Sequence, residues 1–135
     1  MKDGTPAWSV VIVVFNKQHD VLAICRGFNP RNPALPGGDS ELDDNTPAQT
    51  AARELLEETA VTALELRCFD QWEGERGQPV FAFLVPRWTG IRLRTSYEGK
   101  PRWMPPEALL VKTALFREEA QRMFEKLGSS AKEAP

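Results

Sequence analysis

Residues 36–61 read PGGDSELDDNTPAQTAARELLEETAV and combine a Gly-Gly pair, an acidic loop and a charged helix. Thr46 can cap this helix and Pro47 suits its first position, so the helix is predicted to run from Pro47 to about Glu58 or Thr59. Apolar residues at helical spacing support it, namely Ala51, Leu55 and Leu56. The stretch therefore predicts a helix that follows a Gly-Gly turn and an acidic loop.

The charges of this helix indicate a metal site. Glu54, Glu57 and Glu58 lie at helical neighbour spacings, and like charges so placed oppose helix formation unless a cation lies among them. Carboxylate oxygens suit Mg²⁺ or Mn²⁺, which also bind phosphates. Residues 37–61 hold seven acidic residues and one basic residue, Arg53, in a protein of net charge −2. A solvated charged face is the alternative interpretation.

The bulk composition bounds the class of protein. The chain has 135 residues, of which 41% are hydrophobic and 27% charged, values typical of one soluble globular domain spanning residues 1–135. A net charge of −2 argues against a nucleic-acid polymer or an anionic membrane as partner, and favours a small free substrate. The longest apolar run, residues 10–15, is too short to span a bilayer. Cys25 and Cys68 are expected to be buried, reduced thiols, and a cytoplasmic location follows.

The rest of the chain predicts a mixed α/β domain. Residues 9–15 are apolar throughout, as in a strand buried on both faces, and 26–38 are punctuated by Gly and Pro, as in a loop. Residues 128–135 are expected to form a frayed tail. The remaining predicted elements are strands at 21–25, 64–72, 80–85, 91–93 and 103–104, and a second amphipathic helix at 113–127.

The glycine pair and the charged helix together resemble a known motif. Pro36-Gly37-Gly38 followed by AARELLEETAV at residues 51–61 is similar to the box of the Nudix hydrolases, G-x5-E-x7-R-E-U-x-E-E-x-G-U, where U is apolar. The strands before and after this stretch and the closing helix extend the resemblance over most of the chain. It implies an α/β/α sandwich with a mixed β-sheet between helices.

The resemblance also implies roles for the matching residues. Glu54, Glu57 and Glu58 would bind divalent cations, Mg²⁺ or as a substitute Mn²⁺, and one of them would place or deprotonate the attacking water. The backbone carbonyl of Gly37 would complete the metal shell, and Arg53 would orient the glutamates. Metal ions that bridge two phosphates stabilise developing charge and lower the pKa of bound water.

The motif departs from the pattern in two places. Fourteen residues, 39–52, separate Gly38 from Arg53, one more than in the pattern, so the box glutamate falls on Asp44 or Asn45. Ala60 replaces the box glycine, which can take a positive φ that alanine resists, so a different helix exit is expected. We expect altered loop geometry rather than lost activity.

Other candidate site residues lie outside the box. Residues 98–104, EGKPRWM, resemble the MutT branch of the family, in which a loop glutamate assists the metal or the water; Glu98 matches it, and an exposed loop glutamate is the alternative. Trp103 could stack on a base or pack in the core. Arg26 could contact a phosphate or be a strand-end surface charge. Phe28 and Phe81 could line a pocket for the base, and packing in the core is the alternative.

These observations predict a Mg²⁺-dependent MutT-like enzyme that hydrolyses a nucleoside triphosphate to the monophosphate and pyrophosphate, as in clearing unwanted nucleotides from the pool. One alternative is hydrolysis of a nucleoside diphosphate derivative such as ADP-ribose. Another is a nucleotide-binding domain that has lost catalysis, although the chain retains all three box glutamates. Aromatic residues near Trp88 and Trp103 permit a homodimer without requiring one. The base preferred by the enzyme is not predicted.

Overall fold

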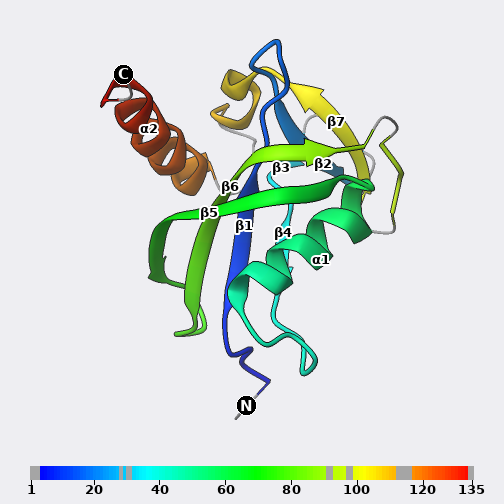
Figure 1. Ribbon diagram of the computed structural model, residues 1–135, viewed down its shortest axis with the longest axis vertical. Coiled ribbons are helices and arrows are strands. Elements are labelled where there is room, and N and C mark those ends of the chain that lie inside the picture. The colour runs from blue at the N-terminus through cyan, green and yellow to red at the C-terminus, as the bar shows by residue number, and fades with distance from the viewer. Residues whose placement is uncertain are drawn as a thin grey trace.

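The computed structural model describes residues 4–27, 29, 32–90, 93–96, 99–111 and 117–133, the last five by backbone alone. It shows β-sheet structure with parallel and antiparallel strand pairs between two helices, as the sequence predicted (Figure 1). One sheet has the strand order β4 (Gly37–Asp39), β1 (Ser9–Val13), β6 (Pro79–Thr89) and β5 (Thr62–Glu73). A second has the order β3 (Pro33–Ala34), β2 (Val21–Arg26) and β7 (Gly99–Met104). The β1–β6 pair is parallel and the other pairs are antiparallel.

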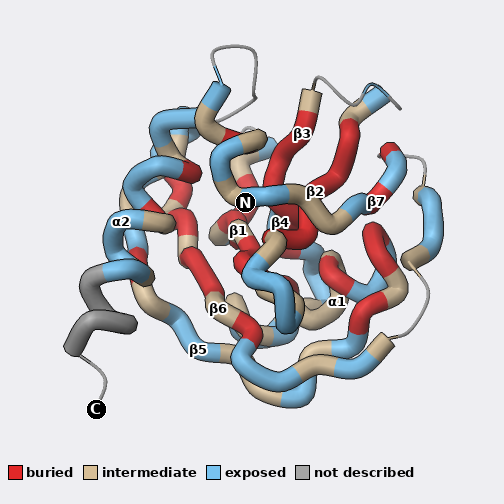
Figure 2. Tube along the Cα trace, turned by 90° about the horizontal axis from the view of Figure 1, so that it is seen from above, coloured by how far each residue is buried: buried red, intermediate tan, exposed pale blue. Residues whose placement is uncertain are grey.

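Strand β1 separates two hydrophobic clusters. Val10 and Ile12 pack in the cluster that contains Ala51 and Leu55 of helix α1 (Pro47–Thr59). Their neighbours Val11 and Val13 pack with Ala120 and Met123 of helix α2 (Arg117–Glu133). Successive side chains of a strand point to opposite faces, so the continuous apolar run serves both helices. The prediction of a strand buried on both faces is confirmed, and Figure 2 shows the buried core of the fold in red.

The segment predicted as a loop at 26–38 contains parts of two strands, so that prediction was wrong in part. Residues 33–34 form β3, and Gly37 and Gly38 begin β4 against β1. A Cβ on Gly37 would lie 2.3 Å from the carbonyl oxygen of Val10. Glycine therefore permits a close approach of the two backbones, and the same residues that suggested a loop allow an edge strand.

The C-terminal elements also differ from the prediction. Within the described residues, α2 starts at Arg117 and continues through Gly128 to Glu133, beyond the predicted end at 127; residues 112–116 lie outside the described part. One glycine costs only about 1 kcal/mol in a helix, which the helix-forming residues around it can offset. The 3₁₀ helix η1 (Pro106–Leu109) was not predicted. Of the predicted strand at 91–93, only Leu93 is described, and it lies in no regular element.

The two cysteines differ in exposure. Cys25 is buried in β2, as predicted, whereas Cys68 is exposed on β5, so the prediction for Cys68 was wrong. Strand β5 has register shifts around this position, which change the face that each residue presents. No helix among the described residues is long and apolar enough to cross a membrane.

Candidate functional site

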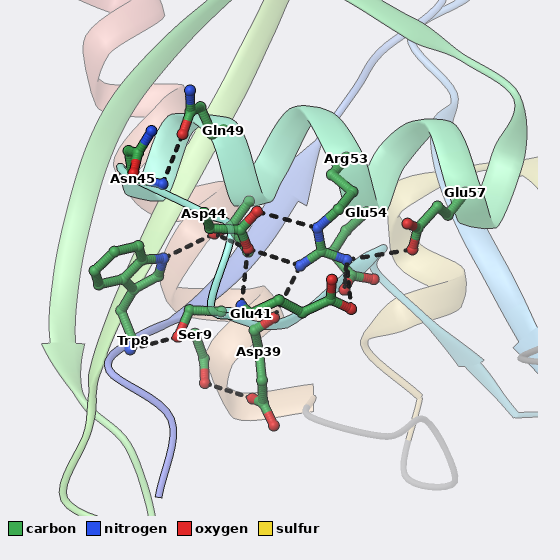
Figure 3. Close-up of polar contacts among 12 residues, drawn as sticks. Trp8, Ser9, Asp39, Glu41, Asp44, Asn45, Gln49, Arg53, Glu54 and Glu57 are labelled. Carbon is green, nitrogen blue, oxygen red and sulfur yellow. Dashed lines mark hydrogen bonds and ion pairs between the residues drawn. The ribbon is translucent and has the colours of Figure 1, made fainter. Parts of the chain in front are cut away.

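Helix α1 carries the charges of the box and begins with a capped first turn. The hydroxyl of Thr46 accepts a hydrogen bond from the backbone N–H of Gln49 at 3.2 Å, and Pro47 occupies the first turn, as predicted. The helix bounds also match the prediction. Ala51 and Leu55 anchor one side of the helix in the core, which leaves the side with Arg53, Glu54 and Glu57 facing the loop that follows the glycine pair (Figure 3).

Arg53 is the centre of this loop and helix face. Its Nε and Nη2 atoms donate to the two carboxylate oxygens of Asp44 at 3.2 and 2.8 Å. Its Nη1 atom lies 2.9 Å from Glu54 Oε1 and 3.3 Å from oxygens of Glu57 and Glu41. Nη2 also donates to the backbone carbonyl of Asp39 at 3.1 Å. One guanidinium thus connects the acidic loop to the glutamates of α1, as the box predicts for this arginine.

Asp44 takes the place that the pattern gives to a glutamate. Only 7% of its side chain is exposed, and its bidentate pair with Arg53 is of the strong, geometrically specific kind. Hydrogen bonding from Arg53 holds the pKa of Asp44 well below its ordinary 3.8, outweighing the burial that raises it. Asn45 instead donates its backbone N–H to Gln49 Oε1 at 2.7 Å. Because of the extra loop residue, either Asp44 or Asn45 could stand at the position of the box glutamate, and of the two it is Asp44 that contacts Arg53.

Glu54 and Glu58 form the buried part of the acidic face. Glu58 is 2% exposed, and the two side chains share a hydrogen bond. Burial raises the pKa of Glu54 above its ordinary value, despite hydrogen bonding from Glu58 and Arg53 that lowers it. Glu57 is different, since 57% of its side chain is exposed. Glu54 is therefore a partly buried carboxylate with a raised pKa, while Glu57 is an exposed one that contacts Arg53 at 3.3 Å.

The residues present fit a hard divalent cation. A Cβ on Gly38 would lie 2.6 to 2.8 Å from the carboxylate of Glu54, so glycine at this position lets that carboxylate lie directly against the backbone of β4. All side-chain donors on this face are carboxylate oxygens, the ligands that Mg²⁺ and Mn²⁺ prefer. Among the described residues no three acidic side chains are already gathered for a metal, and Arg53 Nη1 contacts both Glu54 and Glu57. Glu98, the predicted distal ligand, lies outside the described residues.

A cavity of about 350 Å³ lies on the other side of the glycine pair, between the sheet and α2. Gly37, Gly38 and the predicted substrate residue Arg26 line it. Residues that the sequence analysis did not select also line it, namely Asp39, Trp72, Arg76, Glu119 and Met123. Gly38 thus lies between the cavity and the carboxylate of Glu54.

Asp39, which lines the cavity, accepts hydrogen bonds from two other residues that line it. Arg76 Nη2 donates to Asp39 Oδ1 at 2.8 Å, and the Ser9 hydroxyl donates to the same oxygen at 2.7 Å. Burial raises the pKa of Asp39, but the hydrogen bonds from Arg76 and Ser9 outweigh it and the net pKa is lowered. Arg76 lies in the turn between β5 and β6, and only the strand order β4-β1-β6-β5 brings that turn beside the glycine pair. The local sequence gave no indication of this.

Two predicted aromatic residues, Trp103 and Phe81, are not brought to the cavity. Trp103 packs against Trp88, with ring centroids 5.2 Å apart, and both contact the cluster beneath α1. Phe81 packs against the same cluster. For both residues the core-packing alternative describes their surroundings. Phe28 lies outside the described residues.

Ala60 takes the conformation that the box glycine would supply. Its φ is 68° and ψ 15°, in the left-handed region, and its N–H donates to the carbonyl of Leu56 at 2.9 Å. The different helix exit predicted from this replacement was wrong. Alanine keeps the geometry at a cost of about 1 kcal/mol relative to glycine.

Comparison with known proteins places this chain in a family. The profile of the NUDIX domain matches residues 5–127, most of the chain. The chain belongs to the Nudix family. Nudix hydrolases act on pyrophosphate bonds and generally use divalent metal ions. A search of curated proteins found no match.

Solved Nudix structures share the fold. A MutT protein from Methanosarcina mazei Go1 is 25% identical, with a TM-score of 0.69 over 91% of this chain and 96% of that one. The NUDIX domain of Shewanella oneidensis NrtR, complexed with ADP ribose, is 20% identical, with a TM-score of 0.72 over 94% and 89%. A Caenorhabditis elegans (C. elegans) Ap4A hydrolase in a binary complex is 20% identical, with a TM-score of 0.67 over 90% and 98%. The Nudix α/β/α sandwich is thereby confirmed.

Proposed function

We propose that this Nudix protein is a Mg²⁺-dependent pyrophosphohydrolase that cleaves a nucleoside triphosphate to the monophosphate and pyrophosphate. The observation that carries the proposal is the position of Gly38, which lines the cavity and lets the carboxylate of Glu54 lie directly against it, so that the cavity adjoins the acidic face of α1. A nucleotide in the cavity would direct its phosphates past the glycine pair towards the acidic face of α1. The similarity to the Methanosarcina MutT protein supports the triphosphate as substrate.

Glu54, Glu57 and Glu58 are the proposed metal ligands, with the Gly37 carbonyl and Glu98 as further ones. A bound dication would neutralise phosphate charge and lower the pKa of a coordinated water. Arg53 would hold Glu54 and Glu57, which it contacts at 2.9 and 3.3 Å. Glu54, whose pKa is raised, is the better suited of these to accept a proton from the water.

The cavity offers groups for the rest of the nucleotide. Arg26 and Arg76 supply positive charge that could contact phosphates, and guanidinium groups bind phosphate oxygens well. Trp72 offers an aromatic face at the cavity wall, and base stacking on such a face stabilises binding by about 1–3 kcal/mol with little base discrimination. We infer that Trp72, rather than Trp103 or Phe81, stacks on the base.

A second candidate substrate is a nucleoside diphosphate derivative. The Shewanella domain with a TM-score of 0.72 is complexed with ADP ribose, and the same cavity volume would have to hold the second sugar. Both reactions use the same metal site, so they differ only in which substrate the cavity accepts.

A hydrolysis screen tests the proposal. The protein is incubated with common and oxidised nucleoside triphosphates, ADP-ribose and dinucleoside polyphosphates, with Mg²⁺ or with EDTA, and the products are separated by ion-exchange chromatography. The proposal predicts monophosphate and pyrophosphate from a triphosphate, in Mg²⁺ only. Release of inorganic phosphate from the triphosphate would contradict the cleavage position, and exclusive turnover of ADP-ribose would favour the second candidate.

A further inference from the structure

A chain of hydrogen bonds runs from the start of the protein to Arg53. The indole N–H of Trp8 donates to the Thr50 hydroxyl at 2.8 Å, and that hydroxyl donates to Asp44 Oδ2, also at 2.8 Å. Asp44 in turn accepts both bonds from Arg53. Figure 3 shows Trp8, Asp44 and Arg53 in a row beside the first turns of α1. The box motif specifies neither residue, since Trp8 precedes it and Thr50 falls on one of its variable positions.

The chemistry of the groups fixes the direction of this chain. An indole N–H can only donate, so Trp8 occupies an acceptor position of the Thr50 hydroxyl. The single hydroxyl proton is then directed to Asp44 at 2.8 Å, since the competing carbonyl of Thr46 lies 3.5 Å away. Thr50 is fully buried, so water does not compete for these bonds. The Thr50 hydroxyl thereby holds Oδ2 of Asp44, the same oxygen that accepts from Arg53 Nη2.

Trp8 is itself fixed to the strand that carries the glycine pair. Its backbone N–H donates to the Ser40 hydroxyl at 3.2 Å, and the N–H of Ser40 donates to the Trp8 carbonyl at 2.9 Å. Its ring also packs against the cluster beneath α1. Trp8 therefore connects the residue just beyond β4 with the helix that bears the glutamates.

We propose that Trp8 and Thr50 are positioning residues for the metal-binding carboxylates. They orient Asp44, Asp44 orients the guanidinium of Arg53, and Arg53 holds Glu54 and Glu57. The shorter side chain of Asp44, in a loop with one extra residue, gains in this way a support from the N-terminal segment. The inference rests on the proposed metal-dependent function, and supports of this kind typically change metal affinity by about 10- to 100-fold.

Thr59 provides a matched control within the same helix. It is also fully buried, and its hydroxyl donates to the Leu55 carbonyl at 2.7 Å and accepts from the N–H of Val61 at 3.1 Å. These contacts do not lead to Arg53. Thr50→Val and Thr59→Val therefore both remove a buried hydroxyl, but only the first interrupts the chain.

The test measures Mn²⁺ binding by electron paramagnetic resonance, with no substrate present, and unfolding by urea for each variant. Thr50→Val is expected to bind Mn²⁺ about 10-fold more weakly than Thr59→Val, and Thr50→Ser to restore wild-type affinity. Trp8→Phe, which keeps a ring but removes the donor, is expected to weaken binding about 3-fold, in line with the loss of one hydrogen bond.

The outcomes separate this inference from the function on which it rests. Equal Mn²⁺ affinity of Thr50→Val and Thr59→Val, in a protein whose wild type binds Mn²⁺, would overturn the positioning role alone. If Thr50→Val does not fold, Trp8→Phe with unchanged affinity would overturn it equally. A wild type that binds no Mn²⁺ would overturn the proposed function, and the positioning role with it.

Discussion

Each of the two helices contributes to a network of ion pairs, and the two networks have opposite ratios of cations to anions. On α1 a single cation, Arg53, contacts four carboxylates, those of Glu41, Asp44, Glu54 and Glu57. On α2 two cations, Arg122 and Lys126, contact one carboxylate, Asp70 of β5, at 2.8 and 3.0 Å. The first network has excess negative charge and the second has none.

This difference indicates what each network does. Arg122 also lies over the ring of Trp72, 5.2 Å from its centroid, so the α2 network docks the helix and fixes one wall of the cavity. Its anion is fully paired and needs no further partner. In the α1 network one cation faces four carboxylates, burial raises the pKa of Glu54, and Glu57 stays exposed, as expected of a site that is completed by a dication. We infer that the α2 network is structural and the α1 network functional.

Removing the cation of the α1 network should have the largest effect on stability. Arg53→Met leaves the buried Asp44 and Glu54 without their counter-charge, and breaking such a pair from one side costs about 3 kcal/mol. We expect that loss in the free energy of unfolding, measured with urea in EDTA, and a partial recovery in millimolar Mg²⁺. Arg122→Met is the matched control, since Asp70 keeps Lys126; it should lose less stability and gain nothing from Mg²⁺. Equal responses to Mg²⁺ would remove the distinction between the networks.

Removing the anion of the α2 network, Asp70, should have a smaller and pH-dependent effect on the free energy of unfolding. Hydrogen bonds from Arg122, and to a lesser extent from Lys126, lower the pKa of Asp70 from 3.8 to about 2, against the burial that raises it. A lowered pKa stabilises the fold above the unfolded value of 3.8, and this contribution is lost as the pH falls towards 2. Because its partners Arg122 and Lys126 are half exposed, Asp70 contributes in this way about 1–2 kcal/mol to the free energy of unfolding.

Asp70→Asn should therefore reduce the free energy of unfolding at pH 7 but make little difference near pH 2. Urea unfolding curves across this range measure the effect. Its Mn²⁺ affinity should equal that of the wild type, because Asp70 has no contact with the α1 network. A destabilisation that did not change with pH would show that Asp70 contributes through packing and not through its charge.

The helix ends should give the smallest effects. Ala60 ends α1 with a φ of 68°, where glycine is favoured, whereas Gly128 lies inside α2, where alanine is favoured. A Cβ on Gly128 would meet no atom within 4 Å. Ala60→Gly and Gly128→Ala should each stabilise the protein by about 0.5–1 kcal/mol, seen as a higher melting temperature. Destabilisation by Ala60→Gly would show that the methyl group has a packing role.

The sequence predicted the bounds of α1 and the contact of Arg53 with its glutamates well because they depend on local rules. The cap at Thr46 and the spacing of the apolar residues define the helix within a few turns of chain. The pairing of Arg53 with Glu57 follows from the same periodicity. The sequence left two loop residues, Asp44 and Asn45, as candidates for the position of the box glutamate. Only the folded geometry shows that Asp44 pairs with Arg53 and that Asn45 does not.

The cavity could not be predicted because it depends on strand order. Arg76 and Asp39 are 37 residues apart in the chain and meet only because β4, β1, β6 and β5 are neighbours in that order. Trp72 was assigned to a strand, but the side it faces depends on register shifts in β5 that no local pattern shows. Trp103 was selected for its type, and its packing against Trp88 depends on the second sheet.

The most direct test of the account compares Glu57→Gln of α1 with Glu125→Gln of α2. Both replace an exposed helical glutamate, and Glu125 contacts only Gln121 among the described hydrogen bonds. The measurement is the rate of pyrophosphate release at saturating Mg²⁺ from the nucleotide that the wild type hydrolyses fastest. We expect Glu57→Gln to lower the rate about 100-fold and Glu125→Gln to leave it unchanged. An unchanged rate in Glu57→Gln would contradict the assignment of the α1 network as the metal site.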